Sequence, residues 1–322
     1  MMRMCGSRTP MHPELAFWFA FFVVATSSGG VILGVGAFAA KFKSIKSVER
    51  PDGLLTDSDL NTVFNVGFQL LTWMSLLWST LHDSIGPRAV GVLGMALAVA
   101  GNLLIALAVD SRVTNPYLYA IAYGLVGGGG NGAFIACFHF ASLFEHQGLR
   151  CSVLAAGFNV AGYFYLVLNA EDLELSTYFK CNAVYTAILL AGIARIYPDK
   201  PYDHGDTPTF ATIPRLASMR ANTPLADMRK ALQRARPSLK EPRFWGFCLT
   251  FSWGALVQQW SSGAIGSQLL FPAANDAYFT WGDPTITNAT FLFTPLIGAV
   301  IDRFGFRWPA LLVLLSVRRS PH

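Results

Sequence analysis

Long apolar stretches, almost free of charged residues and separated by polar segments, dominate the hydrophobic pattern of the chain. Eight of them contain 17 to 28 residues, close to or above the roughly 20 residues that a helix needs to cross a bilayer. We predict spans at residues 15–40, 61–81, 89–109, 117–144, 151–169, 178–194, 244–271 and 285–301. A further apolar run at residues 308–317 would rise only about 15 Å as a helix, half of a bilayer core.

The spans are predicted to be helices, because backbone polar groups that face lipid must find partners within their own segment. A closed barrel, the alternative, would show segments of about ten residues in which apolar and polar side chains alternate. Residues 89–109 are apolar all round, which excludes that alternation. The sequence therefore predicts an all-α, polytopic bundle of transmembrane helices.

The composition supports the same class of protein. Hydrophobic residues occupy 53% of the 322 positions and charged residues only 13%, against roughly a quarter in soluble domains. These charges are too few to cover a water-exposed surface or to keep the chain disordered. The five cysteines are scattered along the chain, which also excludes a small disulfide scaffold.

The positions of lysine and arginine predict the orientation, since cytoplasmic loops carry an excess of basic residues. Residues 195–243 hold ten basic and five acidic side chains in 49 positions. With this segment inside, the inner segments together carry 16 of the 24 Lys and Arg residues. We therefore expect a cytoplasmic N terminus, in a multi-pass protein of the plasma membrane rather than of an internal membrane.

The same basic segment divides the chain. We predict a cytoplasmic tail at 1–14, a six-helix bundle at 15–194, a basic cytoplasmic linker at 195–243, and an incomplete second bundle at 244–322 with two helices and a truncated third. Within the linker, Thr223 and Pro224 form a helix start signal. Leu225, Met228 and Leu232 then fall on one face, as in an amphipathic helix on the inner membrane surface. A solvated basic linker is the alternative.

The loops after the second and eighth spans share the pattern D-x-x-G-x-R. Its residues are Asp83, Gly86 and Arg88 in the first copy, and Asp302, Gly305 and Arg307 in the second. Glycine allows a tight turn, and the charged side chains can pair with helix termini or with one another. Because the copies lie six spans apart on the same predicted side, they favour an internal repeat of six-helix halves over an ordinary helix-connecting turn.

With this motif the sequence resembles the major facilitator superfamily of transporters. The family pattern also has a glycine four positions before the aspartate and a basic residue after it. Gly298 and Arg303 supply these in the second copy, whereas Ser79 and Ser84 stand in the first. More narrowly, the chain resembles the large-neutral-amino-acid transporter subfamily and its protist relatives. The stretches that carry this likeness are residues 29–34, 65–88, 127–130, 138–140, 157–159 and 263–269.

This resemblance implies a twelve-helix fold that transports small solutes by alternating access, with the D-x-x-G-x-R residues as a conformational gating motif. Eight spans are complete here, so we expect the first six-helix half with two to three helices of the second, and a chain truncated at its C terminus. The alternative is a non-transporting fragment or membrane partner that retains the first bundle. The sequence leaves the oligomeric state open.

Polar residues near the middle of the spans are the candidates for a substrate cavity. Glycines are frequent in the first and fourth spans, where they allow either close helix packing or contact between bare backbone and a substrate. The candidates are Ser27, Gly29, Gly30, Asn131, Asn159, Tyr163 and Gln258. Each of these polar side chains could instead make an ordinary hydrogen bond between helices.

Motifs of other function classes are missing from the sequence. It contains no HExxH, GxSxG or GxxxxGK[ST] and no paired-cysteine metal spacing, so we predict no enzyme, no cofactor and no metal. The net charge of +5 follows the inner loops, which indicates contact with lipid and no nucleic acid. Because no Asp, Glu, Lys or Arg lies in the middle third of a span, we expect facilitative transport of a neutral amino acid.

Overall fold

The computed structural model describes residues 11–34, 53–169, 173–202 and 289–305, with a few isolated positions between these ranges. The predicted linker helix, most of the span at 244–271 including Gln258, the apolar run at 308–317 and Arg307 lie outside the described residues.

Every described element is a helix. The α-helices are α1 (Pro13–Ser27), α3 (Asp57–Ile85), α4 (Pro87–Asp110), α5 (Pro116–Cys137), α6 (Gln147–Val160), α7 (Leu175–Ile196) and α12 (Thr294–Phe304). The 3₁₀ helices are η1 (Gly29–Gly34), η2 (Phe138–Leu143), η3 (Ala161–Asn169) and η6 (Ala289–Leu292). The all-α prediction is confirmed for the described part, and the helices follow the predicted spans.

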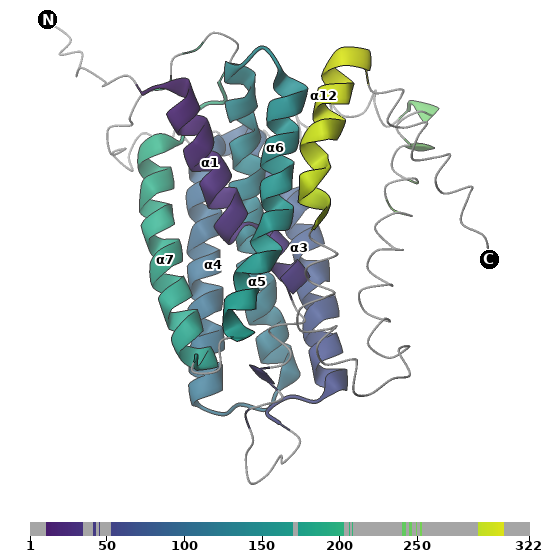
Figure 1. The fold of residues 1–322 in the computed structure, drawn as a ribbon. Coiled ribbons are helices and arrows are strands. Elements are labelled where there is room, and N and C mark those ends of the chain that lie inside the picture. Colours follow the sequence, from purple (N-terminus) through teal and green to yellow (C-terminus); the bar gives the residue numbers. More distant parts are fainter. Residues whose placement is uncertain are drawn as a thin grey trace, which may run out of the picture.

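The helices stand side by side, roughly along one direction (Figure 1). Helix α5 packs against both α3 and α4, α4 packs against α7, and α1 and α12 both contact α6. We call the end at which α1 and α6 begin the near end of the bundle, and the end at which α5 and α7 begin the far end. The buried cluster at the near end includes Phe17, Phe140 and Tyr197, and that at the far end includes Tyr119 and Phe179.

Five segments of the described part are long and apolar enough to cross a membrane: Pro13–Ile32, Pro87–Asp110, Pro116–Leu143, Gln147–Leu168 and Leu175–Ile196. They define an integral membrane protein. Helix α3 is not among these five. It presents an exposed polar stripe made of Asn65, Gln69, Thr72, Ser79 and Asp83, which suits water or another helix better than lipid.

Helix starts are set by the polar residues before the apolar stretches. Thr56 and Asp59 form a capping box at the start of α3, and Asn115 accepts a hydrogen bond from the Tyr117 amide at the start of α5. Proline occupies the first turn of α1, α4 and α5, where its missing N–H costs no helical hydrogen bond. For this reason α1, α3, α4 and α5 begin one to four residues before the predicted spans.

Three of the predicted spans are not uniform α-helices, which the sequence analysis did not predict. The first changes at Ser28, whose backbone is extended with φ −72° and ψ 173°, and continues as η1. The fourth tightens into η2 and the fifth into η3. Helix α1 is therefore interrupted inside the bundle, while α5 and α6 continue in a tighter winding.

Glycines bring the helix backbones together. A Cβ on Gly130 would meet the carbonyl oxygen of Ser27 in α1, and a Cβ on Gly129 would lie 2.6 Å from the amide nitrogen of Ala98 in α4. Helix α5 also accepts a hydrogen bond from Trp78 of α3, whose Nε1 lies 2.7 Å from the Gly128 carbonyl oxygen. These contacts show that close packing is at least one role of the α5 glycines.

The contact at Gly130 can be tested by adding a single methyl group. We expect Gly130→Ala to lower the free energy of unfolding by about 2 kcal/mol, because the new atom meets the backbone of α1. Gly128→Ala is the matched control, since its methyl would meet only the flexible Met74 side chain and alanine is the better helix former. Thermal unfolding in detergent measures both variants, and equal losses would contradict the backbone contact.

Candidate functional site

Three of the predicted cavity residues lie at the interruption of α1. Ser27 is the last residue of α1, and Gly29 and Gly30 begin η1. A Cβ on Gly29 would lie 3.1 Å from the Asn131 Cβ of α5, and a Cβ on Gly30 would meet the Phe158 carbonyl oxygen of α6. The interruption of α1 is therefore enclosed between α5 and α6.

Asn131 forms the α5 side of this site. Its side chain is buried, and its Nδ2 donates a hydrogen bond to Ser75 Oγ of α3 at 2.6 Å. The Ser75 hydroxyl in turn donates to the Leu71 carbonyl oxygen of its own helix at 2.8 Å. Asn131 therefore joins α3 to the region beside the interruption of α1.

Asn159 and Tyr163 form the α6 side. Both are half-buried, Asn159 in the last turn of α6 and Tyr163 in η3. The Tyr163 ring packs edge-on against Phe291 of η6, with ring centroids 6.0 Å apart. The predicted second half of the chain thus reaches this part of the site.

The described residues therefore bring together four of the seven predicted cavity residues, Ser27, Gly29, Gly30 and Asn131, while Asn159 and Tyr163 follow Phe158 along α6 and η3. Three further neighbours of this region were not predicted: Ser75, Phe158 and Tyr123, whose hydroxyl donates to the Ile32 carbonyl oxygen at 3.2 Å. The polar spacing along α3 could have indicated Ser75. Phe158 contacts η1 through its backbone carbonyl, for which a sequence carries no signal.

The first D-x-x-G-x-R copy forms the turn between α3 and α4 at the near end. Gly86 has φ 84°, and a Cβ there would meet the Asp199 carbonyl oxygen. Both the backbone conformation and the lack of space therefore require glycine at this position. Arg88 is buried; its Nε donates to the Tyr197 carbonyl oxygen at 2.6 Å and its guanidinium pairs with Asp199 at 2.7 Å. Arg88 thereby fastens this turn to the end of α7.

Within the described part of the chain, Asp83 has no comparable contact. Its side chain is 73% exposed and lies 3.6 Å from His82 Nδ1. In this structure Asp83 and Arg88 therefore contact other groups rather than each other. Burial raises the pKa of the Tyr197 phenol well above its ordinary value, so this ring stays neutral and Asp199 supplies the negative charge beside Arg88.

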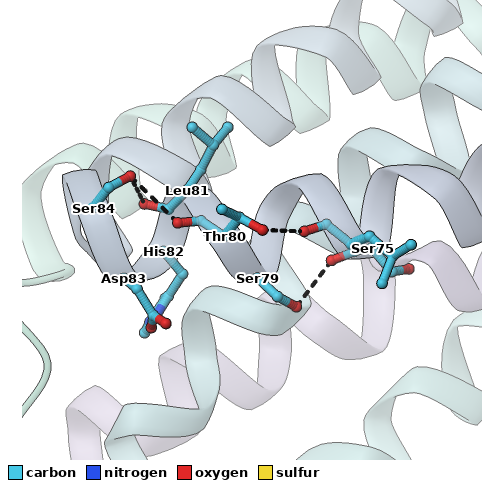
Figure 2. A network of polar contacts seen from close by, with 8 residues as sticks. Ser75, Ser79, Thr80, Leu81, His82, Asp83 and Ser84 are labelled. Atoms are coloured by element: carbon cyan, nitrogen blue, oxygen red, sulfur yellow. Dashed lines mark hydrogen bonds and ion pairs between the residues drawn. The ribbon is translucent and has the colours of Figure 1, made fainter. Parts of the chain in front are cut away.

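The hydroxyl groups before this turn bond to their own helix, as Figure 2 shows. Ser79 Oγ donates to the Ser75 carbonyl oxygen at 2.9 Å, and Ser84 Oγ donates to the carbonyl oxygens of Thr80 and Leu81 at 3.3 and 3.1 Å. Ser79 and Ser84 occupy the positions at which the family pattern has a glycine and a basic residue. Both hydroxyls bond back to the preceding turn of α3, an arrangement that slightly destabilises a helix and can bend it.

The second copy lies at the end of α12 and contacts the start of α6. Asp302 Oδ1 accepts a hydrogen bond from the Gly148 amide at 2.9 Å, and Oδ2 accepts one from the Leu149 amide at 2.8 Å. The residue at the cap position of α6, His146, makes no side-chain capping bond. A carboxylate from another helix therefore satisfies these amides and opposes the positive end of the α6 dipole.

The rest of the second copy supports this contact. Gly298, one turn before Asp302, packs against Gly148 and Ser152 of α6, and Gly305 ends α12 with φ 75°. Glu14 of α1 and Arg150 of α6 form a two-point ion pair at 2.6 and 3.1 Å on the other side of α6. The start of α6 is thus held between α1 and α12, as their arrangement in Figure 1 illustrates.

The class of protein that these observations define is an integral membrane protein with a helical bundle, an interrupted first helix and charged contacts at its near end. No family model matches the chain, and no curated protein matches it either. A more detailed functional assignment therefore depends on the geometry of the site.

The contact between α12 and α6 predicts a difference between the two motif aspartates. We expect Asp302→Asn to weaken this contact by about 1 kcal/mol, because one of the two charge-assisted hydrogen bonds loses its acceptor and the group is exposed. Asp83→Asn should change stability far less. Thermal unfolding of the two variants in detergent measures the difference, and equal losses of stability would contradict the prediction.

Proposed function

We propose that the chain is a membrane carrier of small organic solutes, in particular neutral amino acids, built on the plan of the major facilitator superfamily. Transport is facilitative and proceeds by alternating access, in which two helical bundles rock about a central site. The substrate binds where α1 is interrupted, between the glycine-rich wall of α5 and the end of α6.

The observation that carries this proposal is the interruption of α1. The 15 residues of α1 rise about 22 Å from the near end, which places Ser28 well inside a bilayer core of roughly 30 Å. Irregular backbone at such depth is tolerated only where it is buried in protein or lines a cavity. Interrupted helices of this kind form the substrate sites of many carriers.

The contacts of α6 with η6 and α12 support the rocking step. They occur at both ends of α6: Phe291 meets Tyr163 beside the interruption, and Asp302 caps the first turn. A movement of one bundle against the other would break the exposed Asp302 contact and shift Phe291 relative to the site. Such contacts can hold one conformation and be released in another.

The distribution of charge supports a net-neutral substrate without ion coupling. In the described spans the charged side chains lie at helix ends, as with the pair of Lys180 and Asp110 at 2.7 Å at the far end. The region around Ser27 has only hydroxyl, amide and backbone groups on α1, α5 and α6. A proton-coupled carrier usually keeps an ionisable group at depth.

The basic loops favour an orientation in which the near end faces the cytoplasm, and we place the carrier in the plasma membrane as part of the proposal. Glu145 lies in the turn before α6 and Ser111 in the turn after α4, at opposite ends of the bundle, and both are exposed. We expect a cysteine at position 145 to react with an impermeant thiol reagent only after permeabilisation, and a cysteine at 111 to react in intact cells. The reverse pattern would invert the proposed orientation.

The transport proposal is tested by uptake into liposomes that contain the purified chain. We expect labelled leucine to accumulate to equilibrium faster than in empty liposomes, and to be displaced by other bulky neutral amino acids. A protonophore should change the initial rate of leucine uptake by less than about twofold, because no proton moves with the substrate. Uptake no faster than in empty liposomes would refute transport, and uptake abolished by the protonophore would refute the uncoupled mechanism.

A further inference from the structure

The interruption of α1 leaves the carbonyl groups of its last turn without helical donors. On the η1 side, Ser28 satisfies the donors: its Oγ accepts from the Gly30 amide at 3.3 Å and its carbonyl oxygen accepts from the Val31 amide at 3.2 Å. On the α1 side, the last helical acceptor is the Val24 carbonyl, which receives the Ser28 amide. The carbonyls of the final α1 turn lie beyond it and carry the negative end of the helix dipole.

The Ser27 side chain is a second, independent indication that a polar ligand group binds at the interruption. Its side chain is only 8% exposed, and its Oγ has no hydrogen-bond partner in the described part of the chain. The neighbouring Thr26 hydroxyl, by contrast, donates to the Phe22 carbonyl oxygen at 2.9 Å and accepts from Tyr185. A buried hydroxyl without a partner is costly, so a polar ligand atom at this position would be stabilising.

Among the described residues, no ionised side chain of α1 or α6 lies at the interruption to neutralise the acceptors. On α1 and α6 the charged groups of the described residues are Glu14 and Arg150 in the first turns, where they pair with each other. Around the interruption the contacts are Gly130, Asn131 and the Phe158 backbone. In a low-dielectric interior, the partial charges of the backbone then decide which ligand group is favoured.

We propose that the interruption of α1 binds the primary ammonium group of the substrate, with the α1 terminal carbonyls and the Ser27 hydroxyl as acceptors. An ammonium group has three donors and no acceptor, which matches this set, whereas a carboxylate would face the negative helix end. The inference rests on the proposed function and adds the orientation of the substrate: its amine points to α1 and its carboxylate points away.

Three ligands with the same side chain separate the two charged groups. Leucine carries both, isopentylamine keeps only the amine, and 4-methylpentanoate keeps only the carboxylate. We expect leucine and isopentylamine to raise the melting temperature of the purified full chain at neutral pH. For the same rise, 4-methylpentanoate should need an at least tenfold higher concentration. This comparison needs no variant.

Ser27→Ala tests the hydroxyl directly. It should lower the affinity of the protein for leucine and for isopentylamine about tenfold, the effect expected from the loss of one hydrogen bond to a charged group. It should not lower the melting temperature of the ligand-free protein, because the Ser27 hydroxyl has no partner among the described residues. Ser176→Ala, which removes another buried hydroxyl at the start of α7, is the control and should leave the affinity for all three ligands unchanged.

The outcomes distinguish this inference from the proposed function. If none of the three ligands stabilises the wild-type chain, both the amino-acid substrate and the ammonium site are refuted. If leucine binds but Ser27→Ala weakens 4-methylpentanoate as much as isopentylamine, the ammonium site is refuted and the carrier proposal remains. Stabilisation by sodium chloride over choline chloride that depends on Ser27 would also overturn it, because a metal ion would then occupy the acceptors.

Discussion

Hydrogen bonding of the backbone is the constraint on which the rest of this structure depends. In a bilayer no water is available for an unpaired amide or carbonyl, so most of the described chain remains in helical hydrogen bonds, either α or 3₁₀. Where the helix is interrupted at Ser28, its own hydroxyl and carbonyl oxygen serve the next turn. The same rule explains Asp302, which reaches across from α12 to serve amides at the start of α6.

A second consequence is that this bundle is held together by backbone contacts as much as by side chains. Between helices in lipid there is little hydrophobic driving force, so close approach must supply the attraction. Gly130 and Gly30 allow α5 and α6 to touch the interrupted part of α1 directly. The interruption is therefore fixed in place by atoms that have no rotamers, which suits a site that must present carbonyl groups in a defined arrangement.

The sequence predicted the helices well, because length and apolarity alone determine whether a segment can cross a bilayer. Four of the candidate residues, Ser27, Gly29, Gly30 and Asn131, lie together because residues at a similar depth on neighbouring helices are brought together by packing. The sequence did not predict the interruption at Ser28, where contacts to the backbone of α5 and α6 accompany those of the Leu71 and Asn131 side chains. Nor did it predict Asp199 as the partner of Arg88, 111 positions away.

The cap that Asp302 forms on α6 differs from an ion pair because its hydrogen-bond donors are main-chain amides and not a charged side chain. Its two hydrogen bonds end on the main-chain amides of Gly148 and Leu149, which every residue except proline possesses. A change of side-chain charge at Leu149 would leave the acceptor and both donors in place, whereas a side chain at Gly148 would meet Asp302 Oδ1. A correlated change between homologues would therefore link Asp302 to position 148 through the space beside the carboxylate, and not through complementary charge.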